Sequence, residues 1–506
     1  QASEAFDRQV KPVKEAIPEL PTDAPEFADL MKAQLQGRFK NDKEQILFEG
    51  GLRIRTTMDS DLQTAAARAL REVLPDQDLP QAAVAAIDIR TGDVRAMATL
   101  QRYPAKTYPK DPKTGKAPQP RKALNGYQRN GLNLATSSYH STGSTIKPFT
   151  LAVALQAGHT LGERRFGPQC LKIRDRSEPD GYYRPCNAGD SESGTFSLRT
   201  ALAQSVNTIY IPLANEVGRK KIRDLMLNAG VKVRLDEKGQ PEFSPNVKSF
   251  GLGTTAEVSP LSLANAYATL VNHGVHTAPR FYSEIRIGGT PDSPGRVLEG
   301  YTPKVEKARV LKADVADKVT DAMHDVVEFG TGTAARQPFP VYGKTGTTDE
   351  ARNAWFVGCV REPHYVCIAT WMGYEDNESM HDIAGQGGLI YGGTLPAKIF
   401  SRTFEILREI QAERKARLSG KPAATAKPSA SSTSSPRRRR RSTATPAPRT
   451  TAQVTTAPTS AATSAPRTSP SPRPILPSSR PADSGGAGAT GPPGGAAQPA
   501  SQAPAG

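Results

Sequence analysis

The sequence predicts an α+β fold, in which an antiparallel sheet is flanked by helices and an all-helical lobe is inserted between its strands. Three observations predict it. Strand patterns occur at both ends of residues 50–418, helical patterns fill the middle, and the last strand patterns are short and separated by turns. Short strands joined by turns are typical of an antiparallel sheet, and strands on both sides of a helical segment indicate an inserted lobe.

The N-terminal part of this segment alternates between strand and helix patterns. Residues 50–58 alternate in polarity like a strand, and Ser60 with Gln63 forms a capping-box start for a helix. Residues 82–89 and 94–100 flank the turn sequence Arg-Thr-Gly-Asp, so they predict a β-hairpin.

The middle and the C-terminal part follow a polar insertion at residues 104–122. Helical periodicity, caps and stop signals predict helices over residues 144–157, 197–218 with a break at 205–207, 260–273, 313–328 and 396–418. Short β-rich runs predict strands over residues 342–348, 354–360 and 365–373.

Composition separates this folded part from the two ends of the chain. The hydrophobic fraction of 37% is low for a globular protein, and residues 420–506 are almost entirely Pro, Ala, Ser, Thr, Gly and Arg. Such a segment cannot bury enough apolar surface to offset its ordering entropy, so residues 419–506 are expected to be a disordered tail. Residues 1–49 are polar and rich in Glu, Lys and Pro, and are interpreted as a linker or the trailing end of another domain.

The net charge of +16 lies mostly in the tail. Eleven Lys and Arg follow Gly420 against one acid, Asp483, which leaves the folded part only mildly basic. A nucleic-acid partner is therefore not expected. No stretch approaches the roughly 18 to 20 apolar residues that span a bilayer.

The four cysteines are too few for a disulfide scaffold, and without a Cys-x-x-Cys pair they lack metal-binding spacing. Cys170 and Cys186 bracket a polar loop, and the sequence leaves open whether they are bridged. Cys359 and Cys367 lie in two apolar runs and are interpreted as buried thiols.

Three short motifs carry the chemistry. In chain order they are Ser144-Thr145-Ile146-Lys147, Ser205-Val206-Asn207 and Lys344-Thr345-Gly346-Thr347. The first two patterns each arise by chance about twice in a chain of this length, whereas the third is far rarer. Their combination in suitable structural settings indicates a serine nucleophile activated by a lysine.

The first motif supplies the nucleophile and its base. Ser144 follows Gly143 and is expected to open a helix, where free backbone N–H groups and the positive helix end stabilise developing negative charge. Lys147 lies one turn later on the same face, so its amine can take the Ser144 proton if it is neutral. Burial and the cation of Lys344 both lower the Lys147 pKa, and the two lysines are expected to act as a coupled pair.

The second motif lies in the break between two helices, where alternate residues can point into one cleft. Ser205 can relay a proton to a leaving group. Asn207 can hold a substrate amide or the side chain of Lys147.

The third motif is expected on a strand at the edge of that cleft. An extended peptide can pair with such a strand, while its hydroxyls and the Lys344 amine attract a terminal carboxylate. The backbone N–H of Thr347 is expected to form an oxyanion pocket together with the N–H of Ser144.

With these motifs the chain resembles the penicillin-binding proteins, specifically the transpeptidase domain of the bifunctional class A enzymes. The resemblance runs from about Pro25 to Leu407, with residues 50–418 as the transpeptidase domain. Beyond the three motifs it rests on Gly50–Thr57, Gly143–Phe149, Gly251–Gly253, Pro260 and Ala354–Gly358. Class A members carry an anchor and a glycosyltransferase domain upstream, and this chain, which starts at Gln1, is expected to be a fragment or processed form that lacks them.

The resemblance implies a serine acyltransferase that attacks the D-Ala-D-Ala end of a peptidoglycan stem peptide and passes the acyl group to an amine on a neighbouring strand. β-Lactams would acylate the same serine. It implies no metal or organic cofactor, an extracytoplasmic location, and membrane contact only through the missing anchor. The implied catalytic residues are Ser144, Lys147, Ser205, Asn207 and Lys344, and the implied substrate-binding residues are Thr345, Gly346, Thr347 and Thr348.

The resemblance leaves alternatives open. A D,D-carboxypeptidase or serine β-lactamase shares the motifs and passes the acyl group to water, although the Glu-x-x-Leu-Asn loop of the commonest lactamases is absent. A β-lactam sensor keeps the same serine chemistry. Residues 50–63 and 354–358 favour the synthase. In the tail, Arg437–Arg441 either binds anionic lipid or wall polymer or belongs to a solvated tether.

One departure from the family lies directly before the nucleophile. The family usually has Arg-Gln-Pro-Gly there, where this chain has His140–Gly143. His140 is interpreted as a loop histidine, because Lys147 already fills the role of the base.

Overall fold

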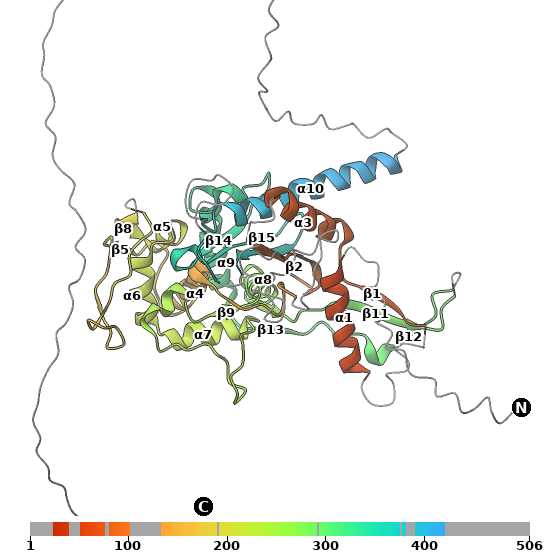
Figure 1. Ribbon diagram of the computed structural model, residues 1–506, viewed down its shortest axis with the longest axis horizontal. Helices are drawn as coiled ribbons and strands as arrows, with labels where there is room; N and C mark the ends of the chain where they lie inside the picture. The colour runs from red at the N-terminus through yellow and green to blue at the C-terminus, as the bar shows by residue number, and fades with distance from the viewer. Residues whose placement is uncertain are drawn as a thin grey trace, which may run out of the picture. The chain divides into compact units, whose positions relative to one another are not determined.

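The structure is a computed structural model that describes residues 24–39, 51–75, 80–101, 133–189, 192–290, 293–374, 377–380 and 390–419 (Figure 1). The predicted insertion at residues 104–122 and the predicted tail beyond residue 419 lie outside the described residues. No helix in the described ranges is long and apolar enough to cross a membrane.

The centre of the fold is a five-stranded antiparallel sheet with the strand order β14-β15-β16-β2-β3 (Figure 1). The strands are β2 (Gln81–Asp88), β3 (Val94–Leu100), β14 (Tyr342–Thr347), β15 (Asn353–Val360) and β16 (Val366–Gly373). The predicted N-terminal hairpin and the three predicted C-terminal strands therefore belong to one sheet. Strands β2, β15 and β16 are buried along their whole length.

Two helices, α3 (Ser60–Val73) and α10 (Leu395–Leu418), pack side by side on one face of this sheet (Figure 1). The predicted cap of α3 is wrong by one residue. Asp59 is the N-cap, and its carboxylate accepts hydrogen bonds from the backbone N–H groups of the next turn. A carboxylate at this position also interacts favourably with the helix dipole. Gln63 instead binds both the N–H and the C=O of Met97 in β3.

The segment between β3 and β14 carries the predicted helical lobe. Its helices are α4 (Lys147–Gln156), α5 (Leu198–Ala203), α6 (Asn207–Val217), α7 (Arg219–Asn228), α8 (Pro260–Val271) and α9 (Ala313–Glu328). Helix α8 is buried at every position, because it lies between the sheet and the other helices. Ser259 caps it and Pro260 occupies its first turn, as the sequence predicted.

The same segment also contains short strand pairs that the sequence did not predict. They are β4 (His140–Ser141) with β9 (Glu257–Val258), β5 (Arg164–Gly167) with β8 (Gly194–Ser197), β6 (Ile173–Arg174) with β7 (Tyr182–Tyr183), and β10 (Val275–Thr277) with β13 (Lys307–Arg309). Single 3-10 turns occur at Gly143–Ile146, Lys248–Leu252, Glu299–Tyr301, Thr333–Ala335 and Asp349–Ala351.

A separate small sheet lies beside helix α1. The strand predicted at residues 50–58 is β1 (Arg53–Thr56), and it pairs with β11 (Tyr282–Ile287), which pairs with β12 (Arg296–Val297). Helix α1 (Pro25–Arg38) packs Phe27 edge-on against Phe281. The sequence assigned no element to this helix, because its apolar residues are few.

Both cysteine pairs form disulfides, and none of the four cysteines is free. Cys359 and Cys367 are buried, as predicted, but the prediction that they are free thiols is wrong, because they form a disulfide. The register of β15 and β16 places these two residues directly opposite each other, a fact that sequence spacing alone does not determine. Cys170 and Cys186, which the sequence left open, are bridged across the polar loop.

Candidate active site

Ser144 lies in a 3-10 turn, Gly143–Ile146, and the α-helix α4 begins only at Lys147. The sequence predicted that Ser144 opens the helix itself. Gly143 has a φ of +55°, and a Cβ on it would lie 2.7 Å from the carbonyl oxygen of Thr347. The turn with the serine therefore presses against β14, which a residue with a side chain would prevent.

The loop before the serine is fixed by the sheet. The Trp355 indole N–H donates to the carbonyl of Ser141 at 2.9 Å, and His140 stacks on Trp371 with ring centroids 3.6 Å apart. Burial, and then the charge of Arg234, lowers the pKa of His140 to about 3. The imidazole is therefore neutral at pH 7 and packs against the sheet. The interpretation of His140 as a loop histidine is wrong about the loop, because the residue lies in β4 and pairs with Val258 of β9.

The two lysines of the motifs are fully buried and meet at one hydroxyl. Lys147 Nζ lies 3.2 Å from Ser205 Oγ, and Lys344 Nζ lies 2.9 Å from the same oxygen. Lys147 also donates to the carbonyl of Ser205 and, at 2.7 Å, to Asn207 Oδ1. The fold thus brings side chains of all three motifs together.

The predicted contact between the Lys147 amine and the Ser144 hydroxyl differs in the structure. Among the hydrogen bonds of the described residues, none joins the Lys147 amine to the Ser144 hydroxyl. Ser205 and Asn207 hold the amine instead. Contacts of this kind are often long in a free enzyme and tighten when substrate binds.

Burial determines the protonation of both lysines. It holds the pKa of Lys147 well below the ordinary value of 10.5, and the charge of Lys344 lowers it further. Burial also lowers the pKa of Lys344 to about 7. The carboxylate of Glu192 acts on both lysines in the opposite direction. Burial and the charge of Lys344 thus act on the pKa of Lys147 in the predicted direction.

The second motif occupies a strained turn between α5 and α6. Ser205 has a φ of +59°, a left-handed conformation that is uncommon for residues other than glycine. Such a conformation costs on the order of 1 kcal/mol or more and persists only where surrounding contacts impose it. Here it places the Ser205 hydroxyl between the two lysines.

The third motif lies on β14, which is the edge strand of the described sheet and pairs only with β15. Thr345 Oγ1 is 2.7 Å from Thr331 Oγ1, and Thr347 Oγ1 accepts from the Gly392 N–H at 3.1 Å. A Cβ on Gly346 would lie 2.6 Å from the carbonyl oxygen of Thr142. Gly346 therefore permits close packing of β14 on the serine turn.

Thr348, the last predicted substrate-binding residue, lies just past the end of β14. Its hydroxyl accepts from the Asn353 N–H at 2.9 Å and so closes the turn between β14 and β15.

An open cleft with a volume of about 940 Å³ connects these residues. Residues of all three motifs line it. A further set of lining residues, which the sequence did not predict, comes from the loop before β8 and contains Cys186, Ala188, Gly189 and Glu192. No sequence signal marked Glu192, because acids are common in polar loops and its distance from the motifs in the chain carries no information about contact.

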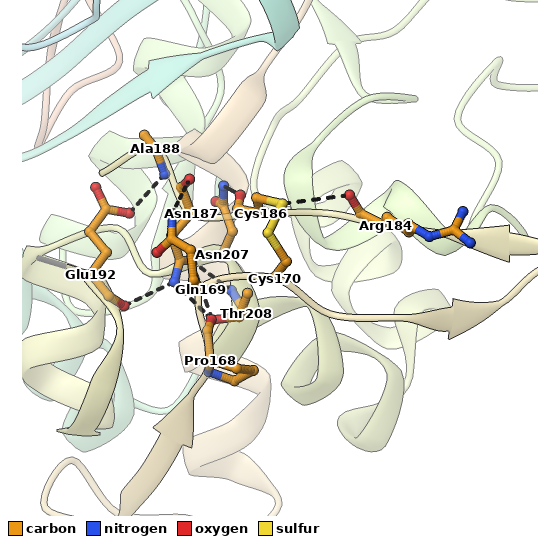
Figure 2. The surroundings of a disulfide bond; sticks show 10 residues. All are labelled: Pro168, Gln169, Cys170, Arg184, Cys186, Asn187, Ala188, Glu192, Asn207 and Thr208. Atoms are coloured by element: carbon orange, nitrogen blue, oxygen red, sulfur yellow. Dashed lines mark hydrogen bonds between the residues drawn. A yellow bond between two sulfur atoms is a disulfide. The ribbon is translucent and has the colours of Figure 1, made fainter. Parts of the chain in front are cut away.

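Figure 2 shows how the loop that carries Cys186 and Glu192 is attached to the second motif. The Asn207 side-chain N–H donates to the carbonyl of Cys186 at 2.9 Å, next to the disulfide with Cys170. Asn187 is buried and binds Thr208 through both its amide N–H and its amide oxygen. The disulfide thus closes the loop, and hydrogen bonds of the Asn187 and Asn207 side-chain amides join the loop to the N-terminus of α6.

The described residues contain no group of three or more His, Cys, Asp or Glu side chains that could hold a metal ion.

Residues 82–386 match the family model described as the penicillin binding protein transpeptidase domain. Penicillin-binding protein 1A of Aquifex aeolicus is 31% identical over 318 residues, which cover 61% of this chain and 36% of that protein. Penicillin-binding protein 1A of Mycolicibacterium smegmatis is 30% identical over 381 residues, which cover 72% of this chain and 42% of that protein. The chain thus spans less than half the length of these relatives.

Solved structures show the same fold. The penicillin-binding protein PonA1 from Mycobacterium tuberculosis superimposes with a TM-score of 0.59 at 26% identity, covering 75% of this chain and 91% of that chain. PonA1 in complex with penicillin V gives a TM-score of 0.58 at 25% identity, covering 79% and 94%. The family model matches more than half of the chain's 506 residues. The chain therefore belongs to the penicillin-binding protein transpeptidase family.

Proposed function

We propose that this chain is a peptidoglycan D,D-transpeptidase that forms an acyl-enzyme at Ser144 with D-Ala-D-Ala stem peptides and cross-links them to an acceptor amine. The observation that carries the proposal is the meeting of two buried lysines, with lowered pKa values, at Ser205 Oγ within the cleft that Ser144 lines. A neutral buried lysine is the base that a serine nucleophile needs.

In the first step Ser144 Oγ attacks the carbonyl carbon of the D-Ala-D-Ala peptide bond. The serine proton passes to the neutral amine of Lys147 as the new C–O bond forms. The C–N bond to the terminal D-Ala then breaks, and the leaving amine takes a proton through the Ser205 hydroxyl, which contacts both lysines. In the second step the acceptor amine attacks the ester carbonyl, loses its proton by the same route, and frees Ser144.

The donor peptide would lie along β14. An edge strand offers unpaired backbone groups to an extended peptide. The hydroxyls of Thr345 and Thr347 and the cation of Lys344 are suited to the terminal carboxylate. The N–H groups of Ser144 and Thr347 lie on segments in contact, as an oxyanion pocket requires.

We further propose that the chain acts on the extracytoplasmic side of the bacterial membrane, where its stem-peptide substrate is found. Two disulfides support this location, because disulfides persist in oxidising compartments.

The first test is covalent labelling with a fluorescent penicillin. We expect the wild-type chain to carry one label per molecule and Ser144→Ala to carry none, because the attacking oxygen is missing. Ser283→Ala, on β11 away from the cleft, is the matched control and is expected to label normally. Label that persists on Ser144→Ala would refute the assignment of the nucleophile.

The second test separates transfer from hydrolysis. A donor thioester or stem peptide is supplied with and without a D-amino acid acceptor, and the products are separated by mass. A transpeptidase gives exchange product that increases with acceptor concentration. Hydrolysis product alone at every acceptor concentration would identify a carboxypeptidase instead.

A further inference from the structure

Glu192 is a carboxylate that lines the cleft, and none of the three motifs includes it. It lines the same cleft as Ser144, Ser205 and Asn207, and its charge acts on both Lys147 and Lys344. In the described part of the chain it has no lysine or arginine within ion-pair distance. It therefore acts on the lysines across the cleft rather than by direct contact.

The position of Glu192 is fixed by hydrogen bonds (Figure 2). Its Oε2 accepts from the backbone N–H of Ala188 at 3.2 Å, and its carbonyl oxygen accepts from the Asn187 side-chain N–H at 2.9 Å. Asn187 in turn binds the backbone N–H of Thr208, the residue after Asn207. The carboxylate and the second motif are thus held by one network.

We infer that Glu192 is a positioning residue that sets the charge of the lysine pair, so that Lys344 keeps a proton while Lys147 remains a neutral base. The inference rests on the proposed function, because it assigns opposite charge states to the two amines of that mechanism.

The physical reason is the cost of two like charges in a buried site. Burial alone favours the neutral form of both lysines, and repulsion between them favours at most one proton. The proposed chemistry needs one proton on the pair, because a cation attracts the substrate carboxylate. A carboxylate on the facing wall raises the pKa of both amines and so restores that single charge at neutral pH.

Other titratable groups near the pair do not provide this charge. Tyr210 on α6 has its ring centroid 5.9 Å from Lys147 Nζ, and burial raises the pKa of its hydroxyl far above neutrality. Asp349 and Glu350, on the turn after β14, also line the cleft, but both are exposed, so solvent screens their charges. The pKa of Glu192 itself is raised mainly by burial, while the two lysines lower it, so the three groups titrate as one system.

The test is the pH dependence of acylation by penicillin in Glu192→Gln. The glutamine keeps an acceptor for the Ala188 N–H and removes the charge. Loss of the charge lowers the pKa of both lysines, so both limbs of the rate profile are expected to move to lower pH, by roughly half a unit or more. Glu192→Asp, which keeps the charge, and Glu413→Gln, a charge removal at the far end of α10, are expected to retain the wild-type profile.

A structural role would not produce this pattern. If Glu192 only holds the loop, Glu192→Gln changes the rate without moving the profile, and the inference fails. If the wild type does not label, or Ser144→Ala does, the proposed function fails instead. A second measurement avoids turnover altogether. In a Ser144→Ala background, nitrogen NMR of the lysine amines follows the titration of Lys344, and an unchanged pKa in Glu192→Gln would also overturn the inference.

Discussion

The two walls of the cleft are built in different ways. The wall that carries the third motif is β14, whose six residues pair in register with β15. The other wall is the loop of residues 168–192. Its described residues contain the short pair β6 with β7, and it is held by the Cys170–Cys186 disulfide and the amide of Asn187 (Figure 2). One wall is thus fixed by a backbone ladder and the other by a few side-chain links.

This difference indicates where each wall is sensitive to change. The ladder needs glycine where another backbone comes close, as at Gly346. In the loop, Asn207 depends on the carbonyl of Cys186 beside the disulfide, and Glu192 depends on the side chain of Asn187. The charges are divided in the same way, with the Lys344 amine on the sheet wall and the Glu192 carboxylate on the loop wall.

The largest expected effect is that of Gly346→Ala on the sheet wall. The new Cβ would lie 2.6 Å from the carbonyl of Thr142, so the serine turn and β14 must separate. We expect this displacement of the serine turn from β14 to lower the rate of acylation by penicillin on the order of 100-fold. Gly162→Ala, whose Cβ would meet nothing within 4 Å, is the control. Wild-type acylation by Gly346→Ala would show that close packing of these segments is not required.

The second prediction compares the two disulfides. Replacing Cys170 and Cys186 together by serine loosens the carbonyl that holds the Asn207 amide, and is expected to lower the acylation rate about 10-fold. Replacing Cys359 and Cys367 together by alanine is expected to leave the rate of the folded protein nearly unchanged. Each replacement is expected to cost roughly 2–3 kcal/mol of unfolding free energy by loss of the cross-link.

Urea unfolding of each double variant measures the loss of unfolding free energy. Stopped-flow kinetics on the same samples measure the rate of acylation by penicillin. Equal losses of rate in the two double variants would mean that the loop disulfide has no special connection with the site.

The smallest expected effect concerns stability. Lys344 has a pKa of about 7 in the folded chain and one near 10.5 when unfolded. Between these values the unfolded chain holds the proton and the folded chain does not, so this lysine makes the free energy of unfolding rise with pH from 7 to 10.5. At pH 7 and below its burial is a net cost. Lys344→Met is therefore expected to stabilise the protein by about 1 kcal/mol at pH 7.

Thermal unfolding at pH 7 and pH 10 tests this prediction. The stabilisation by Lys344→Met must shrink as the pH rises. A gain that is independent of pH would show that folding does not lower the pKa of Lys344.

Much of the fold followed from local patterns. The bounds of α9 match the predicted helix, and α8 has the predicted serine cap, because caps and apolar periodicity are properties of neighbouring residues. The Cys359–Cys367 bond and the pairing of β1 with β11 were missed because both depend on strand register between segments. The N-cap of α3 was missed because Asp59 and Ser60 are both good caps, and the choice depends on the backbone.

The sequence by itself predicted the chemistry that we propose for this protein, because the residue types and spacings of the three motifs indicate a serine, two lysines and a second hydroxyl. Only the tertiary structure decided how Ser144 is presented, which side chains hold the Lys147 amine, and that Glu192 faces the lysine pair. Hydrogen bonds and pKa values depend on what lies within a few ångströms, and the chain brings those groups together from segments that are far apart in sequence.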